Sequence, residues 1–112
     1  MNRILPALAL AAALSLLIGG MAWAQEATFN LTIRSHRFEP AELVVPAGQR
    51  IKLVIFNADA TPEEFESHSL NREKVIVGGA TVTLYLNPLK PGTYEFVGEF
   101  HEDTAKGRIV AK

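Results

Sequence analysis

Residues 91–101 of this 112-residue chain read Pro-Gly-Thr-Tyr-Glu-Phe-Val-Gly-Glu-Phe-His. Pro91-Gly92 is typical of a turn, because proline fixes φ and glycine adopts backbone angles that other residues avoid. In residues 93–98 the aromatic side chains alternate with other residues, which predicts a half-buried β-strand. The stretch therefore predicts a turn, a core strand and a loop that carries His101.

The same strand pattern continues through the chain after residue 24. Phe29, Leu31 and Ile33 alternate with polar residues. In residues 50–57, every second residue from Ile51 to Ile55 is expected on one face of a strand, with Lys52 on the other. Further strands are predicted near residues 42–45, 74–77, 81–86 and 108–111. Residues 62–70 are predicted as a loop that can contain one helical turn. About seven or eight short strands in one domain predict an all-β fold, a Greek-key β-sandwich.

The first 24 residues have the features of a secretory signal peptide. Arg3 provides a positive start, residues 4–18 are apolar, and Ala22-Trp23-Ala24 has the small-x-small form of a cleavage site. We expect cleavage after Ala24, which leaves residues 25–112 as one domain in the periplasm. A retained membrane anchor is the alternative, but Pro6 and Gly19-Gly20 interrupt a run that would need about 20 apolar residues. No stable membrane insertion is expected after cleavage.

Charge and motif content exclude several classes of function. The whole chain has 11 basic and 12 acidic residues, so loss of Arg3 leaves 10 and 12 and a formal charge of −2. No basic face is apparent, so nucleic acid is not an expected partner. The chain has no cysteine and no Gly-x-Ser-x-Gly sequence, and Gly78-Gly79 is expected in a hairpin turn. Hydrolase and transferase chemistry is therefore not predicted.

The stretch 91–101 resembles the metal loop of the cupredoxin superfamily, in which Pro-Gly-x-Tyr-x-Phe-x-Cys precedes a histidine by three residues. Residues 38–40, 43–48 and 51–57 resemble the opening half of the same domain. Together they cover nearly all of the chain after the signal peptide and imply a cupredoxin-like sandwich. The carboxylate-rich residues 59–67 and the ending 100–107 are most similar to EfeO-type domains and to small periplasmic proteins that accompany bacterial iron uptake.

This resemblance implies a metal site in which most of the usual ligands are replaced. In a blue-copper domain, Glu63 stands where the first histidine is expected and Gly98 where the cysteine is expected. His101 matches the second histidine, and Thr104 stands at the position of the axial methionine. Seven of the 12 carboxylates fall in two stretches that this fold is expected to bring to one pole: Asp59, Glu63, Glu64, Glu66, Glu99, Glu102 and Asp103.

The predicted metal ligands are His101, Glu63, Glu66 and Glu99, around a copper or iron ion in a non-blue site. Carboxylate and imidazole ligands suit Cu(II), iron, manganese or zinc, and they disfavour Cu(I). An exposed acidic rim is the alternative, because clustered carboxylates either share a cation or stay well solvated. His68 and His36 are interpreted as surface or structural residues.

Three functions follow from these observations. The first is a periplasmic metal-binding accessory protein in iron acquisition, which by resemblance assists Fe(II) oxidation or delivery to a membrane permease; whether it is an enzyme is left open. The second is a metal-free binding module whose acidic pole docks a periplasmic or membrane partner. The third, a copper-trafficking protein, is disfavoured because Met1 and Met21 are the only methionines and both leave with the signal peptide.

Overall fold

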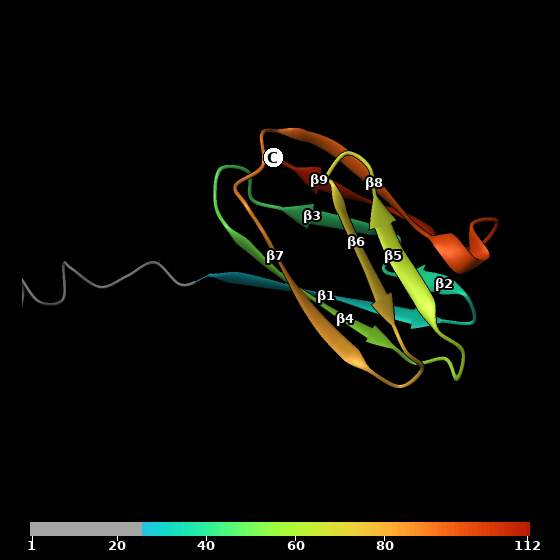
Figure 1. Ribbon diagram of the computed structural model, residues 1–112. Coiled ribbons are helices and arrows are strands. Elements are labelled where there is room, and N and C mark those ends of the chain that lie inside the picture. The colour runs from blue at the N-terminus through green and yellow to red at the C-terminus, as the bar shows by residue number, and fades with distance from the viewer. Residues whose placement is uncertain (1–25) are drawn as a thin grey trace, which may run out of the picture.

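The computed structural model describes residues 26–112, which form a sandwich of two β-sheets (Figure 1). The four-stranded sheet has the order β2-β1-β4-β7 and contains β2 (Arg37–Glu39), β1 (Ala27–Arg34), β4 (Ile51–Asn57) and β7 (Thr81–Leu86). The five-stranded sheet has the order β3-β9-β8-β5-β6 and contains β3 (Glu42–Val45), β9 (Lys106–Ala111), β8 (Gly92–Gly98), β5 (Glu63–Ser67) and β6 (Arg72–Ile76). A short 3-10 helix, η1 (Glu99–His101), follows β8 directly.

The strand pairing brings segments that are distant in sequence to the same end of the sandwich. β1 runs parallel to β4, and β3 runs parallel to β9. β5 lies between β8 and β6 and is antiparallel to both. The start of β5 therefore lies beside the end of β8 and beside η1.

The core is built from the inward-facing residues of both sheets, since successive side chains of a strand point to opposite faces. Ile51, Leu53 and Ile55 of β4 are all fully buried. On the neighbouring strands β5 and β8 of the other sheet, the inward-facing rings of Phe65 and Phe96 have centroids 5.1 Å apart. Full burial of each such side chain stabilises the fold by about 1.5–3 kcal/mol.

The prediction of an all-β sandwich is confirmed, and within residues 26–112 the number of strands is nine. The prediction of a loop with a helical turn at residues 62–70 is wrong, because residues 63–67 form β5. The inward positions of β5 are Glu63, Phe65 and Ser67, of which Phe65 alone is apolar. The usual hydrophobic alternation is therefore absent from this strand. Ser67 is accommodated because its hydroxyl donates to the backbone carbonyl of Glu95 at 2.7 Å.

The predicted signal peptide and its cleavage site lie outside the described residues. Within the part of the chain that the structure describes, no helix is long and apolar enough to cross a membrane.

Candidate functional site

β5 separates the predicted metal ligands into two groups. Glu63 points into the sandwich and is 1% exposed, whereas Glu66 points outward from the same strand. His101 contacts Glu63 at the end of the sandwich where β5 begins. Glu99 instead lies near Glu66 on the outer face. The structure thus forms two pairs, Glu63 with His101 and Glu66 with Glu99, and their role as metal ligands stays a prediction.

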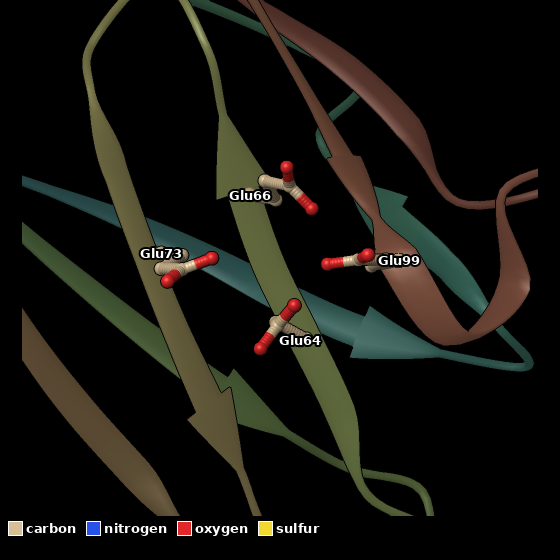
Figure 2. A group of neighbouring side chains, drawn as sticks. All are labelled: Glu64, Glu66, Glu73 and Glu99. Atoms are coloured by element: carbon tan, nitrogen blue, oxygen red, sulfur yellow. The ribbon is translucent and has the colours of Figure 1, made fainter.

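Four glutamates from three elements form what we call the outer-face glutamate group: Glu64 and Glu66 of β5, Glu73 of β6 and Glu99 of η1. One carboxylate oxygen from each lies within 4.8 Å of those of the other three. Figure 2 shows the four side chains on one face of the sheet, with the carboxyl groups of Glu66 and Glu99 turned toward each other. Glu66 is also directly opposite Glu73 in the strand register. Like charges in that position destabilise a sheet, so protons, cations or solvent have to screen the group.

The close approach of these carboxyl groups changes their proton affinity. A hydrogen bond with Glu99, together with partial desolvation, raises the pKa of Glu64 to about 7. The hydrogen bond between Glu66 and Glu99 likewise raises the pKa of Glu66. Glu99 accepts from both neighbours, and these hydrogen bonds lower the pKa of Glu99. The group therefore retains a proton close to neutral pH, which a bound cation can displace.

His68 borders this group at the turn after β5. Its Nε2 lies 3.2 Å from Oε1 of Glu66, and its side chain is 92% exposed. A surface groove of about 400 Å³ runs beside the pair and is lined by Glu66, His68, Ser69, Thr93, Glu95, Phe96 and Val97. The group thus has an imidazole at its edge and is open to solutes.

Glu63 and His101 form a second pair at the end of the sandwich, which we call the inner pair. Oε2 of Glu63 lies 2.6 Å from Nδ1 of His101. Oε1 of Glu63 accepts from the backbone N–H of Glu64 at 3.0 Å and from that of Phe100 at 2.9 Å. The Glu63 side chain is 2% exposed and that of His101 is 26% exposed. Both oxygens of this buried carboxyl group therefore have partners.

The ring of His36 stacks on that of His101, with centroids 3.5 Å apart and an interplanar angle of 12°. His36 lies in the turn between β1 and β2, where it and Ser35 have φ values of 57° and 53°. Asp59 accepts from the backbone N–H of both residues, and its bond to His36 is the main cause that lowers the pKa of Asp59. The hydroxyl of Thr104 donates to the carbonyl of His36 at 2.7 Å. The turn is therefore tethered from two sides against His101.

Sequence reasoning missed Glu73, and it interpreted His36 as a surface or structural residue without predicting its contact with His101. Glu73 could have been found from the antiparallel register of a β5–β6 hairpin, had residues 63–67 been interpreted as a strand. His36 had no local signal, because its contact with His101 depends on how the β1–β2 turn meets η1. Correct strand pairing would therefore have predicted the outer-face glutamate group. The stacking of His36 on His101 could be predicted only from the three-dimensional structure.

Comparisons with known proteins connect this geometry to a family. The family model described as a cupredoxin-like domain matches residues 6–111. An uncharacterized protein of Rickettsia prowazekii (strain Madrid E) is 50% identical over 81 residues, which cover 72% of this chain and 65% of that protein. The chain thus matches less than two thirds of the length of this relative.

Solved structures share the fold at low sequence identity. Auracyanin A, a blue copper protein from Chloroflexus aurantiacus, has a TM-score of 0.68 at 16% identity, with 79% of this chain and 100% of that chain covered. The metal-binding domain of the Cu(I)-exporting ATPase CopA from Streptococcus pneumoniae has a TM-score of 0.66 at 14% identity, covering 81% and 91% of the two chains. The purple cupredoxin of Nitrosopumilus maritimus has a TM-score of 0.57 at 16% identity, covering 74% and 98%. With a family-model match over almost its full length and this shared sandwich, the chain belongs to the cupredoxin-like domain family.

Proposed function

We propose that this protein is a periplasmic metal-binding accessory protein in iron acquisition and that its cation binds at the outer-face glutamate group. The observation that carries the proposal is the convergence of four carboxylate oxygens, within 4.8 Å of one another, from three separate elements. Two of the predicted ligands, Glu66 and Glu99, belong to this group. A cation there would neutralise the opposed charges of Glu66 and Glu73, which the sheet otherwise places against each other.

The donor set limits which ions suit this group. Carboxylate oxygens favour hard cations such as iron and manganese, and an imidazole at the edge adds affinity for Cu(II) or zinc. The sequence has no cysteine, so no thiolate is present to favour Cu(I). Because Glu64 and Glu99 share a proton near neutral pH, cation binding at this group releases a proton and tightens as the pH rises.

The iron role extends the resemblance of residues 59–67 and 100–107 to proteins of bacterial iron uptake. In that role the protein holds iron on an exposed face and presents it to a membrane permease, or assists Fe(II) oxidation with a bound copper ion. The exposed positions of Glu73 and Glu99 support transfer, since surface ligands exchange without opening the core. The copper bound by auracyanin A and by CopA is consistent with metal binding in this fold and does not identify the ion here.

A metal-free binding module is the alternative function. Val75 and Val77, in β6 and just after it, are 47% and 62% exposed. They share this edge of the sheet with Glu73 and create a surface that is both apolar and acidic. Such a surface suits a periplasmic or membrane partner that carries basic and apolar side chains.

The test is calorimetric titration of the metal-free mature domain with Fe(II), Mn(II), Zn(II) and Cu(II) in turn. We expect at least one ion to bind tighter than about 10 μM, which corresponds to roughly −7 kcal/mol. The double variant Glu66→Gln/Glu99→Gln should weaken binding at least tenfold. Glu102→Gln, which removes the same kind of charge from an exposed turn, should leave the affinity unchanged.

Two outcomes contradict the proposal. If none of the four ions binds tighter than about 10 μM, the metal-binding function fails and the docking module remains. If an ion binds but the double variant has wild-type affinity, the ion binds elsewhere on the protein. Oxidation of Fe(II), measured with and without bound copper, then decides whether the accessory role is catalytic.

A further inference from the structure

We propose that Glu63 replaces the copper centre of the cupredoxin fold and closes that end of the sandwich, so that His101 is a structural residue and binds no metal. This inference concerns the inner pair and does not depend on metal binding at the outer-face glutamate group. It rests on three observations: the space at Gly98, the partners of Glu63, and the bonds made by Thr104 and His36.

The space that a cysteine would need at position 98 is already filled. A Cβ atom built on Gly98 would lie 2.6 Å from Cδ of Glu63 and 2.6 Å from Cβ of Ala105. Real Cβ atoms do not approach other heavy atoms so closely, so the carboxyl group of Glu63 stands where a thiolate side chain would begin. In this arrangement, a cysteine at position 98 is therefore sterically incompatible with the observed position of the Glu63 carboxyl group.

The carboxyl group of Glu63 is fully engaged by this chain. Two backbone N–H groups donate to its Oε1, and Nδ1 of His101 lies 2.6 Å from its Oε2. The contacts with Phe100 and His101 connect β5 to η1, and each of these segments carries one of the four expected ligand positions. With Nδ1 protonated, His101 donates to Glu63, so Nδ1 has no lone pair for a metal and the lone pair of the neutral ring lies on Nε2.

The remaining position is also occupied by a structural bond. The hydroxyl of Thr104 donates to the carbonyl of His36 at 2.7 Å, and the His36 ring covers His101. Gly98 has no side chain, and the oxygens of Glu63 and Thr104 are engaged in hydrogen bonds, so Nε2 of His101 is the one side-chain donor atom left at the four expected ligand positions. A single imidazole nitrogen does not form a copper centre. The residues present at this end do not fit a copper ion.

Glu63 is therefore a positioning residue: it orients His101 and joins the start of β5 to η1. In this arrangement, hydrogen bonds to Glu63 hold β5 and η1 together. In a copper-binding cupredoxin, the metal ion would hold the corresponding segments together. Glutamine has the same shape, but its NH₂ group would face Nδ1 of His101. Glu63→Gln should therefore keep the fold while it moves the proton of neutral His101 from Nδ1 to Nε2.

The experiment is ¹⁵N NMR of the imidazole nitrogens at mildly alkaline pH, in the mature domain and in Glu63→Gln. We expect a protonated Nδ1 in the wild type and an unprotonated Nδ1 in Glu63→Gln. An unprotonated Nδ1 in the wild type would overturn the proposal. An Nδ1 that stays protonated in a folded Glu63→Gln domain would also overturn it.

A titration with Zn(II) completes the test. We expect both nitrogen signals of His101 to stay unchanged at one equivalent of Zn(II), and a shift of its Nδ1 or Nε2 signal would overturn the inference. Movement of the His68 signals alone would agree with both proposals. If no signal moves and no zinc binds, zinc is excluded as the cation of the outer-face glutamate group, and the wild-type and Glu63→Gln spectra still decide the role of Glu63.

Discussion

Glu63 and Glu64 are consecutive residues of β5, yet their carboxyl groups lie on opposite faces of the five-stranded sheet. Glu63 is buried against His101, and Glu64 shares a hydrogen bond with Glu99 on the outer face. The alternation of a β-strand produces this separation. As a result, each face can be altered without replacing a ligand or hydrogen-bonding side chain of the other.

Replacing Glu64 with glutamine should flatten the pH dependence of stability. The pKa of Glu64 rises from its usual 4.5 to about 7 in the folded protein, so folding favours the protonated form. Its stabilising contribution is complete below pH 4.5 and is lost as the pH rises through about 7. Thermal unfolding at pH 5 and pH 8 in the presence of a chelator should show a smaller loss for Glu64→Gln than for the wild type.

The matched control for this experiment is Glu102→Gln, which removes an exposed glutamate outside the group. It should keep the pH dependence of the wild type. A wild-type domain that is equally stable at both pH values would contradict the expected sharing of a proton between Glu64 and Glu99.

Replacing Glu63 with alanine should lower the free energy of unfolding by roughly 3–5 kcal/mol, the range for removing one partner of a buried pair. The substitution leaves two backbone N–H groups and the His101 ring without their acceptor. We expect the lower part of this range, because the His101 side chain is 26% exposed and water can reach it. Urea unfolding measures the change, and Glu63→Gln should lose clearly less. Equal losses for the two variants would show that the hydrogen bonds contribute little.

Replacing Asp59 with alanine should destabilise the turn between β1 and β2. Asp59 accepts two backbone N–H groups, from Ser35 and His36, and loss of an acceptor for such groups costs about 1–3 kcal/mol. Because these bonds lower the pKa of Asp59 below its usual 3.8, its contribution is present above that pH and is lost in stronger acid. The stability difference between wild type and Asp59→Ala should therefore narrow as the pH falls below about 3.8.

Asp103→Ala is the control for Asp59, because Asp103 is exposed in the turn after η1. It should leave both the neutral and the acid stability unchanged. The ring signals of His36 should also shift in Asp59→Ala, since the turn that holds its ring against His101 loses a tether. Unchanged ring signals would mean that Asp59 is not needed to hold the ring of His36 against His101.

The fold could be predicted from the sequence because most core strands carry their own signal. In residues 50–57 and 93–98, large apolar residues recur at every second, inward-facing position, as in Ile51, Leu53 and Ile55, and the order of these segments matches the family pattern. β5 could not be predicted this way, since hydrogen bonds at Glu63 and Ser67 replace apolar burial at two of its three inward positions. The division of the candidate ligands into two groups could not be predicted for the same reason: without a strand at residues 63–67, nothing separates Glu63 from Glu66. The sequence thus identified the candidate ligands, but it did not predict that they lie on two different faces of the sheet.

Replacing Gly98 with alanine should destabilise the domain through a steric effect alone. The backbone at Gly98 has φ −90° and ψ 105°, which alanine adopts easily, so the cost arises from a Cβ placed 2.6 Å from Cβ of Ala105 and from Cδ of Glu63. Overpacking of this kind costs about 1–3 kcal/mol. Ala105→Gly removes one of the two contacts. In urea unfolding, the double variant Gly98→Ala/Ala105→Gly should therefore lose less free energy of unfolding than the two single variants lose together, by about 0.5–3 kcal/mol. If the losses of the two single variants simply add, Glu63 alone fills the space at Gly98. If Gly98→Ala leaves the free energy of unfolding unchanged, the space can hold a larger side chain.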